Sequence, residues 1–126
     1  MKIIKYSFVI FTLIALLSCS SDEKGNKQIL VYEGRQSVQC ESSGLTPAES
    51  AEKLIVRGVD VIESYCGSIT GVGVSAVCGA GTLEIIVHKI HASNLDAAED
   101  AGFRRVKTLV DEENNVGYQI YACEDS

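Results

Sequence analysis

The sequence predicts a single α+β domain in which two helices cover one face of an antiparallel sheet. Short apolar runs alternate along the chain with two segments that carry helix-capping residues. Each of these helical segments ends in a glycine followed at once by an apolar residue, at Gly58-Val59 and at Gly102-Phe103. Four cysteines lie between positions 40 and 123, which favours a small domain held by disulfides. These observations together indicate the α+β class.

Five segments rich in apolar and β-branched residues are predicted as strands. They are residues 29–32, 59–65, 83–90, 103–110 and 116–123. The segment at 83–90, LEIIVHKI, is the strongest and carries apolar residues on both faces. We therefore expect it at a central position in the sheet. A polar turn at 111–115 contains two asparagines, which tolerate positive φ, and it joins the last two strands.

The first helix is predicted from Pro47 to about Arg57. Thr46 is a favourable N-cap, Pro47 suits the first helical position, and Glu49 completes a capping box. Gly58 suits the left-handed residue after the helix. The face predicted to pack on the sheet contains Ala48, Ala51, Leu54 and Ile55.

The second helix is predicted to start at Ser93 and to be short. Ser93 would be its N-cap, Asp96 lies three residues later, and Gly102 ends the segment. The resulting order is β-α-β-β-α-β with one additional C-terminal strand. Two split βαβ units joined by right-handed crossovers predict a small ferredoxin-like sandwich, stapled by disulfides, over residues 29–126.

The cysteines at 40, 66, 78 and 123 are expected to form two disulfides. Cys66 and Cys78 flank one connection between neighbouring strands, so we expect them to pair with each other. Cys40 would then pair with Cys123 and join the exit of the first strand to the end of the chain. Four cysteines allow three connectivities, and the sequence alone leaves the others open.

The first residues have the pattern of an export signal. Lys2 and Lys5 precede an uncharged apolar run of twelve residues at 6–17, which is shorter than the roughly 20 residues of a membrane-spanning helix. The run ends in Leu16-Leu17-Ser18-Cys19. A polar tether then continues to Gln28.

This ending resembles the lipobox of bacterial lipoproteins, with Leu at −3, a small residue at −1 and Cys at +1. The resemblance implies that residues 1–18 are removed between Ser18 and Cys19, and that Cys19 receives a diacylglycerol on its thiol. Leu17 departs from the family, where smaller residues are commoner at −2. Ser20 after the cysteine implies transfer to the outer membrane, facing the periplasm, if the host is Gram-negative.

The charge of the chain restricts its partners. Eleven basic residues stand against 17 acidic residues, a net charge of −6, and loss of Lys2 and Lys5 with the signal leaves the mature chain more acidic still. An acidic surface argues against binding to nucleic acid and to anionic membrane surfaces. We therefore expect membrane contact through the lipid anchor and an envelope protein as partner.

The glycine-rich segment at 67–81 is the most unusual part of the domain. It lacks the Gly-Lys-Ser/Thr of a P-loop. It is either a structural loop held by its cysteines or a loop that contacts a peptide or ligand. The candidate binding residues are Gly71, Val72, Gly73 and Val74.

No pattern for catalysis or metal binding is found. The sequence lacks the G-x-S-x-G, C-x-x-C and H-E-x-x-H motifs. His88 and His91 lie three residues apart in a predicted strand, so they would point to opposite faces and could not share a metal. We expect no catalytic residue, no metal and no cofactor other than the lipid on Cys19.

The sequence therefore predicts a non-catalytic envelope lipoprotein that acts as a binding, inhibitor or assembly-accessory module. The alternative is a redox- or metal-handling lipoprotein that uses clustered cysteines, which requires a reducible pair or free thiols. A third class, an envelope hydrolase, would need a pocket that brings His88 or His91 next to a carboxylate.

Overall fold

The computed structural model describes residues 27–124. The predicted signal, its cleavage site at Ser18 and Cys19, and nearly all of the tether lie outside the described residues. Within the described range, no helix has the length and apolar character needed to cross a membrane.

The described residues form five strands, two α-helices and two 3₁₀ segments. The strands are β1 (Gln28–Gly34), β2 (Glu63–Thr70), β3 (Glu84–His91), β4 (Arg104–Arg105) and β5 (Gly117–Tyr121). The α-helices are α2 (Pro47–Ile55) and α3 (Leu95–Asp100). The 3₁₀ segments are η1 (Ala92–Asn94) and η2 (Val106–Leu109).

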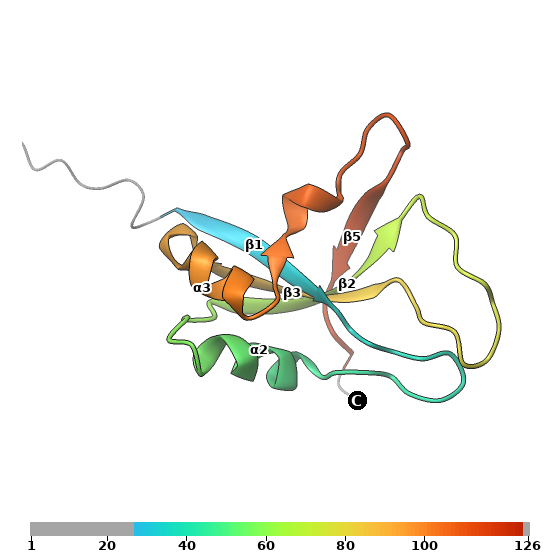
Figure 1. The fold of residues 1–126 in the computed structure, drawn as a ribbon, viewed down its shortest axis with the longest axis horizontal. Coiled ribbons are helices and arrows are strands. Elements are labelled where there is room, and N and C mark those ends of the chain that lie inside the picture. Colours follow the sequence, from blue (N-terminus) through green and yellow to red (C-terminus); the bar gives the residue numbers. More distant parts are fainter. Residues whose placement is uncertain (1–26, 125–126) are drawn as a thin grey trace, which may run out of the picture.

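The strands form one antiparallel sheet in the order β4-β1-β3-β2-β5 (Figure 1). As predicted, β3 is central. It pairs with all seven residues of β1, from Gln28–His91 to Gly34–Ile85, and on its other side with β2. The prediction of an α+β fold is confirmed, with two helices, an antiparallel sheet and two disulfides.

Two apolar clusters hold the layers together. One lies between the sheet and the helices, and its buried residues are Val31, Leu54, Val59, Ile90, Ala98 and Phe103. The other lies on the opposite face, where η2 covers part of the sheet, and its buried residues are Ile85, Val87 and Val106. Because successive side chains of a strand point to opposite faces, β3 supplies both clusters and is buried on both sides.

The start of α2 follows its local sequence signals. The Thr46 hydroxyl accepts from the backbone N–H of Glu49, and the Glu49 carboxylate accepts from the backbone N–H of Thr46 at 2.8 Å. This capping box was predicted. The predicted buried face was wrong at Ala48 and Ile55, which are both exposed, whereas Ser50 is fully buried.

The start of the second helix was also predicted incorrectly. Ser93 lies within η1, and α3 begins at Leu95 without a capping hydrogen bond from a side chain. The chain enters η1 directly from β3, so the turn forms without a capping side chain.

Two strand predictions were wrong in extent. β2 begins at Glu63, because Val59 instead donates its N–H to the Leu54 carbonyl at the end of α2 and fills the core. β2 then continues through Gly67, where a Cβ would lie 2.5 Å from the Gln119 carbonyl oxygen of β5. That glycine permits close strand pairing and does not begin the loop.

The predicted strand at 103–110 contains only the two residues of β4. From Val106 the chain turns into η2. Val106 and Leu109 both pack on the sheet, and this spacing of three suits a 3₁₀ helix, in which residues i and i+3 lie on one side.

Candidate functional site

The two disulfides join Cys40 to Cys78 and Cys66 to Cys123. All four predicted cysteines are therefore paired, but the predicted connectivity was wrong. β5 lies beside β2 with Tyr121 opposite Cys66, which brings Cys123 to Cys66. Cys78 lies in the loop after β2 and reaches the loop after β1, where Cys40 lies.

These two loops lie side by side. The first comprises residues 35–45, between β1 and α2, and the second residues 71–83, between β2 and β3. We call them the loop pair. Figure 1 shows them extending together beyond the sheet, at the opposite end of the molecule from the start of β1.

Gln39 makes most of the polar contacts between the two loops. Its backbone N–H donates to the Ala80 carbonyl at 2.9 Å, and its carbonyl accepts from the Gly79 N–H at 3.0 Å. Its side-chain amide donates to the carbonyls of Ser75 and Gly81. With the Cys40–Cys78 disulfide, these bonds fix the second loop against the first.

Backbone crowding requires glycine at two positions near these loops. Gly44 has φ +76°, and a Cβ there would lie 2.2 Å from the Arg35 carbonyl oxygen. Gly71 has φ +79°, and a Cβ there would lie 2.0 Å from the Asn115 carbonyl oxygen. The second loop therefore starts in contact with the turn at 111–115.

The second loop exposes apolar side chains. Val72, Val74 and Val77 are 47 %, 49 % and 56 % exposed. All four predicted binding residues, Gly71 to Val74, lie at the exposed start of this loop. The structure thus presents three exposed valines on a loop that the Cys40–Cys78 disulfide joins to the neighbouring loop.

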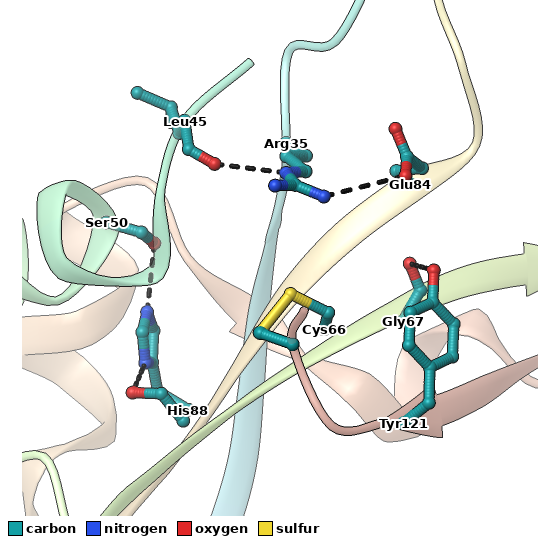
Figure 2. Close-up of a disulfide and its surroundings, with 10 residues drawn as sticks. Arg35, Leu45, Ser50, Cys66, Gly67, Glu84, His88 and Tyr121 are labelled. Atoms are coloured by element: carbon teal, nitrogen blue, oxygen red, sulfur yellow. Dashed lines mark hydrogen bonds and ion pairs between the residues drawn. A yellow bond between two sulfur atoms is a disulfide. The ribbon is translucent and has the colours of Figure 1, made fainter. Parts of the chain in front are cut away.

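A hollow of about 580 Å³ lies at the base of the loop pair, beside the Cys66–Cys123 disulfide. Its lining residues are Arg35, Ser43, Cys66, Glu84, Tyr121, Ala122 and Glu124. The Arg35 Nε donates to the Leu45 carbonyl at 3.1 Å, and its Nη1 lies 3.6 Å from Glu84 Oε1 (Figure 2). These bonds make Arg35 part of the support of the first loop.

Ser37 and Tyr121 complete this base. The Ser37 hydroxyl donates to Glu84 Oε2 at 2.6 Å and also contacts the Thr82 hydroxyl. The Tyr121 hydroxyl donates to the Gly67 carbonyl at 3.2 Å (Figure 2). The polar groups around the hollow are thus largely engaged with one another.

His88 belongs to a buried polar network that the sequence did not predict. The Ser50 hydroxyl donates to Glu33 Oε1 at 2.6 Å, and Lys53 pairs with Glu33 Oε2 at 2.8 Å. Since the Ser50 proton is used there, His88 Nε2–H donates to the Ser50 Oγ at 2.9 Å. His88 Nδ1 then accepts from the Ser64 hydroxyl at 2.7 Å.

This network resembles a nucleophile–base arrangement only in its residue types. His88 and Ser50 are completely buried, so no substrate could reach the Ser50 hydroxyl in this conformation. Burial lowers the pKa of His88 from 6.5 to about 4, and the nearby Glu33 charge only partly opposes this. The neutral imidazole is therefore a structural bridge between α2, β2 and β3.

Residues 27–124 contain no group of three or more His, Cys, Asp or Glu side chains arranged to hold a metal. His91 Nδ1 is buried and has no hydrogen-bond partner within this range. The four cysteines in this range are all oxidised. The exposed loop pair is thus the most distinctive surface of the described domain.

Comparisons with protein-family models, with curated proteins and with solved structures found no match to this chain.

Proposed function

We propose that the chain is an envelope lipoprotein whose domain is a non-catalytic binding module, and that the loop pair contacts an envelope protein. The observation that carries this proposal is the exposure of three valines on a segment held by a disulfide and by the Gln39 hydrogen bonds. A single exposed apolar side chain is ordinary, whereas a group of them on one surface is typical of an interaction site.

The rigidity of the loop pair favours binding. A free loop must be ordered when it binds, and each ordered side chain reduces the affinity. The Cys40–Cys78 disulfide and the contacts of Gln39 provide that order before a partner arrives. A loop ordered in advance retains more of the free energy gained by burying its valines.

The position of the loop pair agrees with an anchor at Cys19. The tether leads to Gln28 at one end of β1, and the loop pair extends beyond the other end (Figure 1). With lipid on Cys19 and cleavage after Ser18, the contact surface would point away from the membrane. Two or three acyl chains would give stable attachment, whereas one chain alone binds only marginally.

The ferredoxin-like topology is part of the same proposal. It is supported by the order β4-β1-β3-β2 with antiparallel neighbours, and by helices that follow β1 and β3. In this interpretation β5 is the additional strand, added beside β2. The loop pair then corresponds to the two connections that leave the sheet at one end.

The second candidate function is redox handling, because Cys40 and Cys78 are both exposed. An exposed disulfide is more open to attack by a thiolate than the largely buried Cys66–Cys123 pair. This function would use reversible reduction of Cys40–Cys78 by a dithiol protein. It requires that this disulfide be reduced while the domain remains folded.

The test places a photo-crosslinking residue at Val74 in the full chain in its native host. The matched control is the same residue at Val56, which is 71 % exposed at the end of α2, away from the loop pair. We expect one discrete adduct from position 74 and none from position 56. Replacement of Cys40 and Cys78 by Ser should weaken the adduct, because the loop loses its order.

Equal labelling from both positions would contradict a binding role for the loop pair. The anchor is tested separately by detergent phase partition and intact mass. Cys19→Ala should abolish acylation, and an acyl chain that persists in this variant would overturn the lipoprotein assignment.

A further inference from the structure

A second hollow, of about 430 Å³, lies outside the loop pair and includes Lys27 and the start of β1. It lies between the start of β1 and η2, on the sheet face that α2 and α3 do not cover. Its lining residues are Lys27, Ile29, Leu30, Arg105, Val106, Lys107, Val110 and Tyr118. We call it the basic groove.

The charge of this groove is opposite to that of the chain. The chain carries a net charge of −6, yet three cations and no carboxylate line the groove within the described residues. Basic side chains that gather on an acidic protein indicate an anionic partner for that surface.

The cations of the groove differ from most others in the domain. Arg35, Lys53 and Lys89 each form an ion pair with a glutamate. By contrast, Lys27, Arg105 and Lys107 are exposed and form no ion pair with any residue in the range 27–124. Within these residues, no carboxylate neutralises their charge.

The floor of the groove is apolar. Val106 is buried, Leu30 and Tyr118 are half-buried, and Val110 is 48 % exposed. Phosphate alone would use only the cations of the rim. A ligand with an anionic head and an adjoining apolar portion would use both rim and floor, as a phospholipid does at its phosphate and first methylenes.

The groove lies where the chain leaves the domain toward the tether. Lys27 lines it and is held in place because its carbonyl accepts from the Ala92 N–H at 2.7 Å. The eight residues from Cys19 to Asn26 span at most about 30 Å when extended. An anchored domain would therefore hold the groove near the membrane surface.

We propose that the basic groove binds the headgroup of an anionic phospholipid in the membrane that holds the chain. The phosphate would lie against Lys27, Arg105 and Lys107, and the adjoining methylenes against Val106 and Val110. This inference rests on the proposed lipid anchor for its source of ligand. It adds an orientation to that anchor, with the groove against the membrane and the loop pair directed outward.

The acidic turn after η2 limits this contact. Asp111, Glu112 and Glu113 are exposed and follow Val110, but they do not line the groove. They would repel an anionic surface spread over the groove and this turn together. The groove would therefore contact a single headgroup. The acidic surface as a whole still disfavours adsorption over a broad area of membrane.

The test uses the purified mature chain in micelles of a neutral detergent and measures amide hydrogen exchange by mass spectrometry. One sample contains added phosphatidylglycerol, another phosphatidylcholine, a third inorganic phosphate and a fourth polyglutamate. We expect protection of residues 27–31 and 105–110 with phosphatidylglycerol alone. Protection should weaken as salt is added, because exposed charges are screened.

The variant Lys27→Gln/Arg105→Gln/Lys107→Gln should abolish this protection, and each single change should weaken binding about fivefold. Arg57→Gln is the matched control, because Arg57 is exposed at the end of α2 and outside the groove. It should leave the protection unchanged. Far-UV circular dichroism checks that each variant is folded.

Equal protection by phosphatidylcholine would overturn the proposal, since the cations would then have no part in binding. Protection by phosphate or by polyglutamate without lipid would overturn it as well, and would assign the groove to a free anion or to an acidic protein. The intact mass of the same sample reports acylation of Cys19. A negative result for acylation of Cys19 and a negative result for lipid binding by the groove are therefore distinguishable.

Discussion

Protonation of His88 should make the stability of this domain depend on pH. His88 is completely buried, and both ring nitrogens are engaged by the hydroxyls of Ser50 and Ser64. Its ring also lies 5.7 Å from that of Phe103, in an apolar setting. A charged imidazole there would have neither water nor a carboxylate in direct contact. Burial is therefore the main cause of the lowered pKa of His88.

The direction and size of this pH dependence follow from the pKa of His88 in the folded and unfolded states. The pKa is about 4 in the folded state and 6.5 when His88 is exposed by unfolding. The unfolded state therefore binds more protons between these values, and stability falls as the pH falls. The contribution is complete above about pH 6.5, and roughly 2 kcal/mol is lost between about pH 7 and about pH 4.5.

The assay is urea unfolding followed by far-UV circular dichroism at several pH values, for the wild type and for His88→Gln. Glutamine can donate to Ser50 and accept from Ser64 but does not titrate. Carboxylates titrate in both proteins, so the difference between their slopes isolates His88. Parallel slopes would refute the assignment of a neutral, buried His88.

Two further predictions concern the disulfides and the helix caps. Cys66→Ser and Cys123→Ser should each cost roughly 4 kcal/mol in the free energy of unfolding, and the double variant little more, because one disulfide is lost in each case. The double variant Cys66→Ser/Cys78→Ser removes both disulfides, so it should lower the free energy of unfolding more than either single variant. If the double variant were no less stable than the single variants, Cys66 would pair with Cys78 as the sequence predicts. Thr46→Ala should cost about 1 kcal/mol through loss of the capping box, whereas Ser93→Ala should change stability little. Thermal unfolding of both variants checks this, and equal losses would contradict the observed caps.

Features encoded within a few residues were predictable from this sequence. The capping box at Thr46 depends on residues three apart, and the central position of β3 depends on its own apolar content. Val72 and Val74 were identified because glycines surround them, and the structure places both on an exposed loop. Such features need no knowledge of which segments become neighbours.

Features that depend on distant neighbours were missed. The sequence predicts Gly67 as a loop residue, whereas the structure places it in β2. The close approach of Gln119 from β5, which requires a glycine there, comes from a segment far along the chain. The predicted disulfide connectivity was wrong for the same reason, because the pairing depends on β5 lying beside β2. A signal for the buried network did exist: Ser50 lies beside Ala51 and Leu54 on a helix, and His88 interrupts the most apolar strand. Polar residues in such positions usually have a buried partner.

The pairing of β1 along its full length has a mechanical consequence. If the lipid holds the chain at one end and a partner holds the loop pair at the other, a pull between them acts along β1. Hydrogen bonds between antiparallel strands run perpendicular to the strands, so such a pull loads the ladder between β1 and β3 in shear. Its bonds must then give way together and not one after another, and the domain would resist extension between the two attachments.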